Sequence, residues 1–231
     1  MTISGSPDQP GEPEIKYRLV LFELKLCDRH RRIHVCHQAN DLNKSTLKRA
    51  AMPRQLEAIQ NYIHAKDKGR PHLMKSAFAE TADLEVVVET GTISFPPLLN
   101  GRDAITRVLV RDFGQSFENI YTFCLSPPPR DKDNSFSCSW LVGFSDKKSG
   151  AVRLGCGHYD WFFQANDQSL VEKLKITVRF MLVLSPDSLY PLMHWLSKLP
   201  YPWCSPAEAL NDMPQLAEIK NVFGFINQVR I

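Results

Sequence analysis

The chain has 231 residues, of which 43% are hydrophobic and 23% are charged, and its formal net charge is +3. This composition is ordinary for a globular protein with a buried core. The weak charge without clustered Lys and Arg gives no support for a nucleic-acid partner, and the sequence lacks the roughly 18 continuous apolar residues of a membrane span.

The cysteines are spread along the chain without a CxxC pair, as in a cytoplasmic protein with reduced thiols; they are Cys27, Cys36, Cys124, Cys138, Cys156 and Cys204. The sequence contains no phosphate-binding loop, no Gly-x-Ser-x-Gly motif and no HExxH motif. We therefore expect neither a cofactor nor a metal.

Residues 1–14 form a polar tail rich in Pro, Gly and Ser, which we expect to be disordered, and residues 15–51 form an accessory segment too small for its own core. The accessory segment contains five residues of zinc-binding type, namely Cys27, His30, His34, Cys36 and His37. Zinc sites need two ligand pairs around a structured stretch, and this spacing fits no such pattern. A basic, solvated turn is the favoured interpretation.

From residue 52 the hydrophobic pattern becomes regular. A helix is predicted from Pro53 to Gly69, with its apolar face formed by Leu56, Ile59, Tyr62 and Ile63. A short helix over 71–79 and a strand over 84–90 follow. The next predicted helix, residues 101–113, has an apolar face of Ile105, Val108, Leu109 and Phe113.

The period then changes to two over four successive segments, 118–125, 135–144, 151–163 and 172–184. Turn-rich connections predict that these strands form antiparallel hairpins. Residues 185–231 are predicted to be a helical extension packed on the domain, and Ser205 and Glu208 in it have the spacing of a helix capping box. The expected fold is α+β: a cone-shaped, curved antiparallel sheet covered by the N-terminal helices, with an apolar hollow between the two layers.

Several stretches resemble the SnoaL-like branch of the nuclear transport factor 2-like superfamily over residues 52–184. They are YIHAKDKGRPHLMKSAFAETADLEVVV, GRDAI and GHYDWFFQANDQSLVEKLKI. This superfamily includes polyketide cyclases, steroid isomerases, dehydratases and proteins without a known reaction. The resemblance therefore implies the fold, whereas the function must be argued from the site.

The stretch GCGHYDWFF, residues 155–163, carries two ionisable groups inside a predicted strand. Alternation places His158 and Asp160 on one face together with Phe162, and the aromatic residues Tyr159 and Trp161 on the other. Both orientations satisfy the alternation. The resemblance favours an inward carboxylate, and we therefore expect His158 and Asp160 to line the hollow.

The resemblance also matches Tyr62, Asp67 and Asp160 to the catalytic positions of bile-acid dehydratase-like relatives. Where several such enzymes carry a histidine on the first strand after the helices, this chain has Tyr121 nearest the position. The expected catalytic set is thus Asp160, His158, Asp67, Tyr62 and Tyr121. The expected ligand contacts are Phe162, Trp140 and Phe113.

Two functions follow as alternatives. The first is a protein that binds a small, mostly apolar molecule, polycyclic ones included; if it is an enzyme, we expect cofactor-free isomerisation, dehydration or cyclisation by proton transfer. The second is a non-catalytic ligand-binding or interaction module that forms a homodimer through the outer sheet face.

Overall fold

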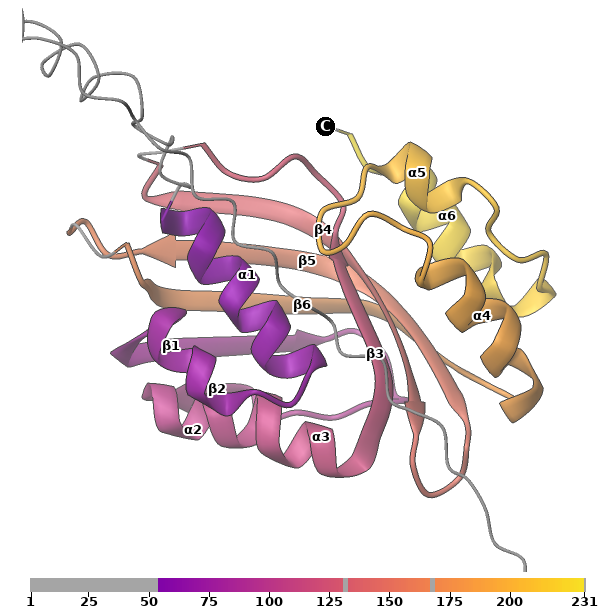
Figure 1. Ribbon diagram of the computed structural model, residues 1–231, viewed down its shortest axis with the longest axis horizontal. Coiled ribbons are helices and arrows are strands. Elements are labelled where there is room, and N and C mark those ends of the chain that lie inside the picture. Colours follow the sequence, from indigo (N-terminus) through magenta and orange to yellow (C-terminus); the bar gives the residue numbers. More distant parts are fainter. Residues whose placement is uncertain (1–53, 131–132, 167–168, 231) are drawn as a thin grey trace, which may run out of the picture. The chain divides into compact units, whose positions relative to one another are not determined.

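A curved six-stranded sheet with the strand order β2–β1–β6–β5–β4–β3 forms the centre of the structure (Figure 1). The structure is a computed structural model, which describes residues 54–130, 133–166 and 169–230. The strands are β1 (Phe78–Val88), β2 (Leu98–Asn100), β3 (Phe117–Cys124), β4 (Ser135–Asp146), β5 (Val152–Phe163) and β6 (Val171–Leu184). The four strands β3 to β6 form antiparallel hairpins, as predicted. The sheet is mixed rather than purely antiparallel, because β1 pairs with β6 in parallel.

The N-terminal helices cover the face of the sheet that we call the inner face. They are α1 (Arg54–Asp67), the 3-10 turn η1 (Pro71–Ser76) and one helical run made of α2 (Arg102–Thr106), the π turn η2 (Arg107–Asp112) and α3 (Phe113–Ser116). On the predicted apolar face of α1, Ile59, Tyr62 and Ile63 are buried and Leu56 is half-buried. The second predicted helix is shorter than expected, because the chain enters β1 at Phe78. The predicted α+β class is thus found.

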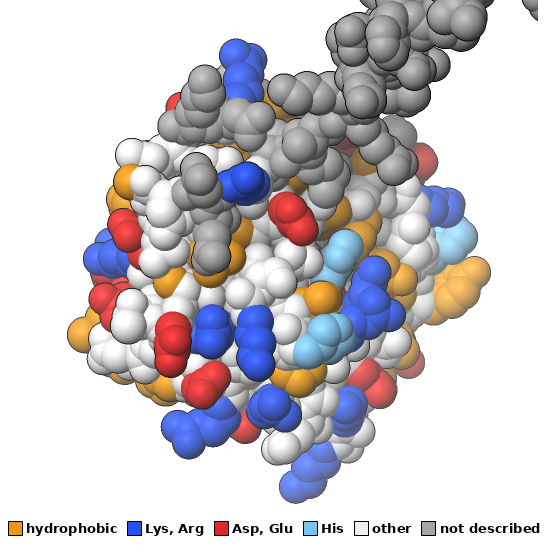
Figure 2. All heavy atoms as spheres, turned by 60° about the vertical axis from the view of Figure 1, so that its left-hand side comes forward, with side chains coloured by type: hydrophobic (Ala, Val, Ile, Leu, Met, Phe, Trp, Pro, Cys, Tyr) orange, Lys and Arg blue, Asp and Glu red, His pale blue; other side chains and the backbone are white. Residues whose placement is uncertain are grey.

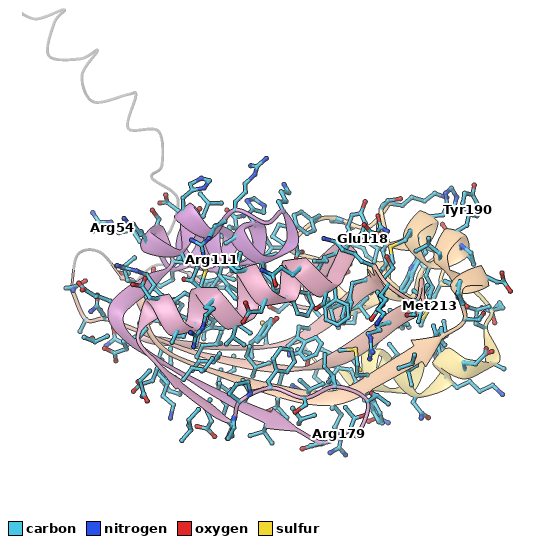
Figure 3. The ribbon with its side chains drawn as sticks, turned by 90° about the horizontal axis from the view of Figure 1, so that it is seen from below. Arg54, Arg111, Glu118, Arg179, Tyr190 and Met213 are labelled. Atoms are coloured by element: carbon cyan, nitrogen blue, oxygen red, sulfur yellow. The ribbon has the colours of Figure 1, made fainter. Side chains whose placement is uncertain are left out.

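The C-terminal segment packs on the opposite, outer face and covers part of it. It consists of η3 (Pro186–Ser188), α4 (Leu189–Leu196), α5 (Pro206–Leu210), η4 (Ala217–Ile219) and α6 (Lys220–Gln228). The predicted capping box at the start of α5 is present, since Ser205 and Glu208 exchange hydrogen bonds. In Figure 3 the segment carrying Tyr190 and Met213 gathers at one end of the sheet, whereas the helices with Arg54 and Arg111 lie over its face.

Two hydrophobic cores follow from this arrangement, one on each face of the sheet. The inner core lies under α1 and the helical run and includes Trp140 and Trp161. The outer core lies under α4 to α6 and includes Leu154, Cys156 and Trp195. Burial on both faces explains why β4 and β5 contain long buried runs.

A bulge decides which residues of β6 face which core. The pairing of β5 with β6 shifts between Cys156 and Gly157, so that Arg179 is the extra residue of β6. A bulge of one residue moves the following side chains to the other face. Val178 therefore lies in the inner core, whereas Phe180 packs on the outer one.

The surface shown in Figure 2 carries basic and acidic side chains interspersed with small hydrophobic areas. Among residues 54–130, 133–166 and 169–230, no helix is long and apolar enough to cross a membrane.

Candidate functional site

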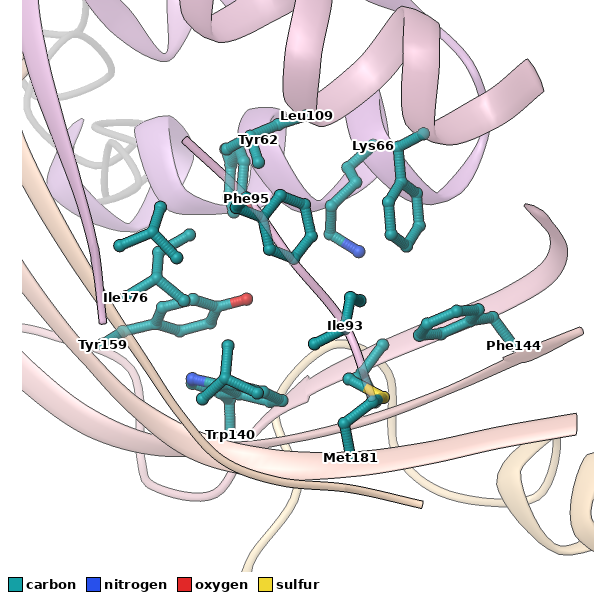
Figure 4. A pocket seen from close by; sticks show the side chains of 14 residues that line it. Tyr62, Lys66, Ile93, Phe95, Leu109, Trp140, Phe144, Tyr159, Ile176 and Met181 are labelled. Atoms are coloured by element: carbon teal, nitrogen blue, oxygen red, sulfur yellow. The ribbon is translucent and has the colours of Figure 1, made fainter. Parts of the chain in front are cut away.

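An apolar cavity of about 50 Å³ lies between the inner sheet face, α1, the helical run and the loop of residues 89–97 (Figure 4). Nearly all of its lining side chains are aliphatic or aromatic. They are Tyr62, Lys66, Val86, Ile93, Phe95, Leu109, Phe113, Trp140, Val142, Phe144, Tyr159, Ile176, Val178 and Met181. Lys66 is the single charged residue in this lining.

Local sequence explains how the helix and the sheet form this wall. Tyr62 and Lys66 are four residues apart on α1 and therefore lie on the same helix face. On β5 the inward position opposite Trp140 is Gly157. A Cβ atom at Gly157 would overlap the carbonyl oxygen of Thr177 and approach Trp140 Cζ2 to 2.8 Å. The glycine thus leaves the room in which the Trp140 ring lies against the cavity.

Lys66 belongs to a buried, hydrogen-bonded group at the end of α1. Its Nζ donates to Asp67 Oδ1 at 2.6 Å and to Thr122 Oγ1 at 2.7 Å. Asp67 accepts three further bonds: from Thr122 Oγ1 at 2.9 Å, from the Thr122 backbone N–H at 2.7 Å and from the Tyr201 hydroxyl at 3.1 Å. The two side chains are only 7% and 1% exposed, so their opposite charges stabilise each other away from water.

The two cavity tyrosines are poor proton carriers at neutral pH. Burial raises the pKa of Tyr62, and a side-chain hydrogen bond with Tyr159 opposes this effect in part. Burial also raises the pKa of Tyr159, and the nearby Tyr62 adds to it. The Trp140 Nε1–H is buried and has no acceptor among the described residues. The polar atoms on the cavity wall are thus mainly hydrogen-bond donors.

Three of the residues expected at the site line the cavity: Tyr62, Trp140 and Phe113. Asp67 lies beside it, but both of its carboxylate oxygens accept bonds from protein donors. A carboxylate held in this way positions Lys66 and is not directed at a ligand as a base.

The predicted inward orientation of His158, Asp160 and Phe162 is wrong, because all three lie on the outer face. His158 is exposed, shares a 3.2 Å hydrogen bond with Ser139 Oγ and contacts the Phe225 ring. Asp160 accepts a bond from Ser137 Oγ at 2.7 Å, and Phe162 is 39% exposed. The reason is that Leu154 and Cys156, on the same face of β5, pack into the outer core.

The aromatic residues that alternate with His158 and Asp160 fill the interior instead. Trp161 is fully buried, and its ring lies 5.5 Å from that of Tyr62 in an edge-on contact. Tyr159 lies between Trp140 and Trp161, at ring distances of 5.5 and 5.2 Å.

Tyr121 also points away from the cavity, contrary to expectation. Its ring stacks on Phe123, with 6.4 Å between centroids, and packs against the outer core. The register of β3 shifts between Glu118 and Tyr121, and Asn119 has a positive φ of 54°. Because of this irregularity in β3, the side chain of Thr122 faces inward toward Asp67, and that of Tyr121 faces outward.

Three important residues were not anticipated at the site: Lys66, Thr122 and Tyr159. The spacing of Lys66 from Tyr62 was the available signal, whereas Thr122 and Tyr159 depended on which face each strand turns inward. The Cys/His cluster at 27–37, the tail 1–14 and the accessory segment 15–51 lie outside the described residues. Within the described ranges, no group of three or more metal-ligand side chains converges.

No protein-family model matches the sequence, and no curated protein matches it. Solved structures that match include a nuclear transport factor 2-like protein from Salmonella enterica subsp. enterica serovar Typhimurium str. LT2, at 16% identity and a TM-score of 0.43, covering 54% of this chain and 88% of that one. LinA matches at 10% identity and a TM-score of 0.46, covering 55% and 85%.

A protein with a ketosteroid isomerase-like fold from Catenulispora acidiphila DSM 44928, solved with trimethylamine, matches at 11% identity and a TM-score of 0.39, covering 52% and 83%. The TM-scores of these three matches are all below 0.5, so the matches carry no argument about the function of this chain. At such identities the likeness concerns the fold alone.

Proposed function

We propose that this protein binds a small, mostly apolar molecule in the cavity between the helices and the inner face of the sheet. The main observation in support of this proposal is that aliphatic and aromatic side chains surround unfilled space. The charge of Lys66 beside this space is neutralised by its buried ion pair with Asp67. Apolar space of this kind excludes water and favours apolar atoms.

The size of the cavity limits the ligand. An engineered apolar cavity of about 150 Å³ accommodates benzene, whereas the space here is about 50 Å³. The cavity as it stands therefore suits a group of a few heavy atoms. A larger ligand, including the polycyclic one suggested by the family, requires the loop 89–97 to move.

Proton-transfer catalysis has weaker support than binding. His158 and Asp160 are on the outer face, and the oxygens of Asp67 are held by Lys66, Thr122 and Tyr201. We therefore favour the non-catalytic alternative, a ligand-binding module.

The proposal also includes a cellular location and a homodimer. A cytoplasmic location is supported by the four cysteines of the described residues, all of which are unpaired. A homodimer through the outer sheet face would have to use the part that α4 to α6 leave open, where Phe162 is exposed.

Xenon provides a direct test, because it is small, apolar and known to enter dry protein cavities. We expect xenon to shift the methyl NMR signals of Ile93, Ile176, Val178 and Met181. Val178→Phe should abolish these shifts by filling the space. The control is Val183→Phe on the same strand, whose side chain is 48% exposed. Unchanged methyl signals in the wild-type protein under xenon would disprove the proposal.

A further inference from the structure

The loop of residues 89–97 separates the cavity from a second space. Ile93, Phe95 and Phe113 line the inner cavity and also line an outer hollow of about 350 Å³. In Figure 4 the segment carrying Ile93 and Phe95 crosses in front of the cavity. The two spaces are thus neighbours, and side chains of this loop and of α3 form the partition.

Arg153 of β5 lines the outer hollow, and its guanidinium is incompletely paired. One nitrogen, Nη1, donates to the Thr92 carbonyl oxygen at 2.7 Å, and the guanidinium carbon lies 5.6 Å from the centre of the Phe117 ring. The Nε–H is buried and has no acceptor among the described residues. No carboxylate of the described ranges forms an ion pair with Arg153.

The acidic groups near Arg153 do not take the place of a partner. The backbone N–H groups of Ser149 and Lys148 donate to the Asp146 carboxylate and lower its pKa, and the charge of Arg153 adds a smaller lowering. Asp112 also lines the hollow and is exposed to solvent. An anion in the hollow would therefore have to bind at the Arg153 side, away from Asp112.

The inner and outer spaces differ in what they can recognise. The ammonium of Lys66 is neutralised by Asp67, so the inner cavity offers little attraction for a negative charge. Arg153 forms no ion pair within the described residues, and its buried Nε–H has no acceptor there, so its guanidinium is available to a negatively charged ligand in the hollow. A guanidinium presents its donors as a fork that matches the two oxygens of a carboxylate.

We infer that the outer hollow is an anion subsite in which Arg153 binds the carboxylate of a small amphipathic acid, whose apolar tail passes Ile93 and Phe95 into the inner cavity. This inference rests on the proposed function and adds the chemical class of the ligand. It also explains how a cavity too small for a whole ligand can take part in binding, because it holds only the tail.

The test compares three probes with the same tail, hexanoate, 1-hexanol and hexylammonium, by calorimetric titration of the full-length protein. We expect hexanoate to bind at least about tenfold more tightly than 1-hexanol, as for a hydrogen-bonded charge, and hexylammonium to bind most weakly. Arg153→Gln should lower the affinity for hexanoate to that for 1-hexanol and leave 1-hexanol unchanged. The control Arg111→Gln removes the same charge from an exposed helical position and should retain the preference.

A second measurement does not depend on the folding of a variant. The Arg153 Nε–H signal in ¹⁵N NMR of the wild-type protein should shift with hexanoate and stay in place with 1-hexanol. Equal affinities for the acid and the alcohol, or a preference that survives Arg153→Gln, would overturn the anion subsite and leave the cavity proposal intact. Failure of xenon and of all three probes to bind would overturn both.

Discussion

Asp67→Asn is expected to destabilise the fold strongly, because it removes the counter-charge of buried Lys66 without changing the shape of the side chain. Oδ1 of Asp67 accepts bonds from Lys66 and Thr122 Oγ1, and Oδ2 accepts bonds from the Thr122 N–H and Tyr201. An asparagine must turn its NH₂ group toward one of these pairs of donors. Either orientation leaves donors facing donors.

The magnitude follows from the burial of the pair. With Lys66 and Asp67 only 7% and 1% exposed, the remaining ammonium cannot reach water easily. Removal of one partner from a buried ion pair costs about 3–5 kcal/mol, a large share of the roughly 5–15 kcal/mol that stabilises a typical domain. Urea unfolding followed by tryptophan fluorescence and far-ultraviolet circular dichroism measures this loss directly.

Two comparisons make the experiment decisive. Asp160→Asn is the matched control, since that half-buried side chain has Ser137 as its one hydrogen-bond donor within the described ranges; we expect a loss of about 1 kcal/mol or less. The double variant Lys66→Met with Asp67→Asn removes both charges and should recover much of the lost stability. A single Asp67→Asn variant as stable as Asp160→Asn would refute the buried-pair argument.

Three further predictions concern Gly157, His64 and the capping box of α5. Gly157→Ala should cost about 1–3 kcal/mol or more in urea unfolding because of the overlap with the Thr177 carbonyl, whereas Gly114→Ala, which meets nothing within 4 Å, should not destabilise the protein. Burial, and to a smaller extent the charge of nearby Lys68, lowers the pKa of His64 below its ordinary 6.5. On acidification the unfolded chain therefore binds a proton at His64 before the folded protein does. The stability that comes from neutral His64 is complete above pH 6.5 and is lost as the pH falls toward the pKa of the folded state. A His64→Gln variant whose urea midpoint falls between pH 7.5 and 5.5 as much as that of the wild type would contradict this. Ser205→Ala should lower stability by about 1 kcal/mol through loss of the helix cap and raise the lowered pKa of Glu208 toward its ordinary value, and an unchanged NMR titration of Glu208 would count against the capping box.

Local patterns predicted much of the fold. The helical spacing through Ile59 and Ile63, the period-two alternation of β3 to β6 and the Ser205–Glu208 capping box all depend on neighbours in sequence, and all are found. The cavity residues Tyr62, Phe113 and Trp140 were also anticipated. Tyr62 and Phe113 lie on helical elements with one buried face, whereas Trp140 lies on β4, which is buried on both faces.

The chemistry-bearing residues were harder to place because a strand buried on both faces has no unique inward side. The alternation on β5 allowed either His158 or Tyr159 to face the interior. The structure turns Tyr159 inward because the C-terminal helices cover Leu154 and Cys156, which lie on the same face as His158. The C-terminal segment was expected to pack on the domain, but nothing local shows which face it covers.

Local periodicity predicted most of the elements, their order and the α+β class, because helix and strand periods are properties of adjacent residues, but it did not predict the short strand β2. Only the tertiary structure decided that Lys66 and Asp67 meet Thr122 and Tyr201, and that Arg153 lies at a second hollow beside the loop 89–97. These contacts join residues far apart in the chain, and they depend on strand register, on one bulge in β6 and on the path of the C-terminal segment. In a sheet that is covered on both faces, the helices packed on each face decide which side chains point inward. The residues of the site can therefore be placed only from the complete packed structure.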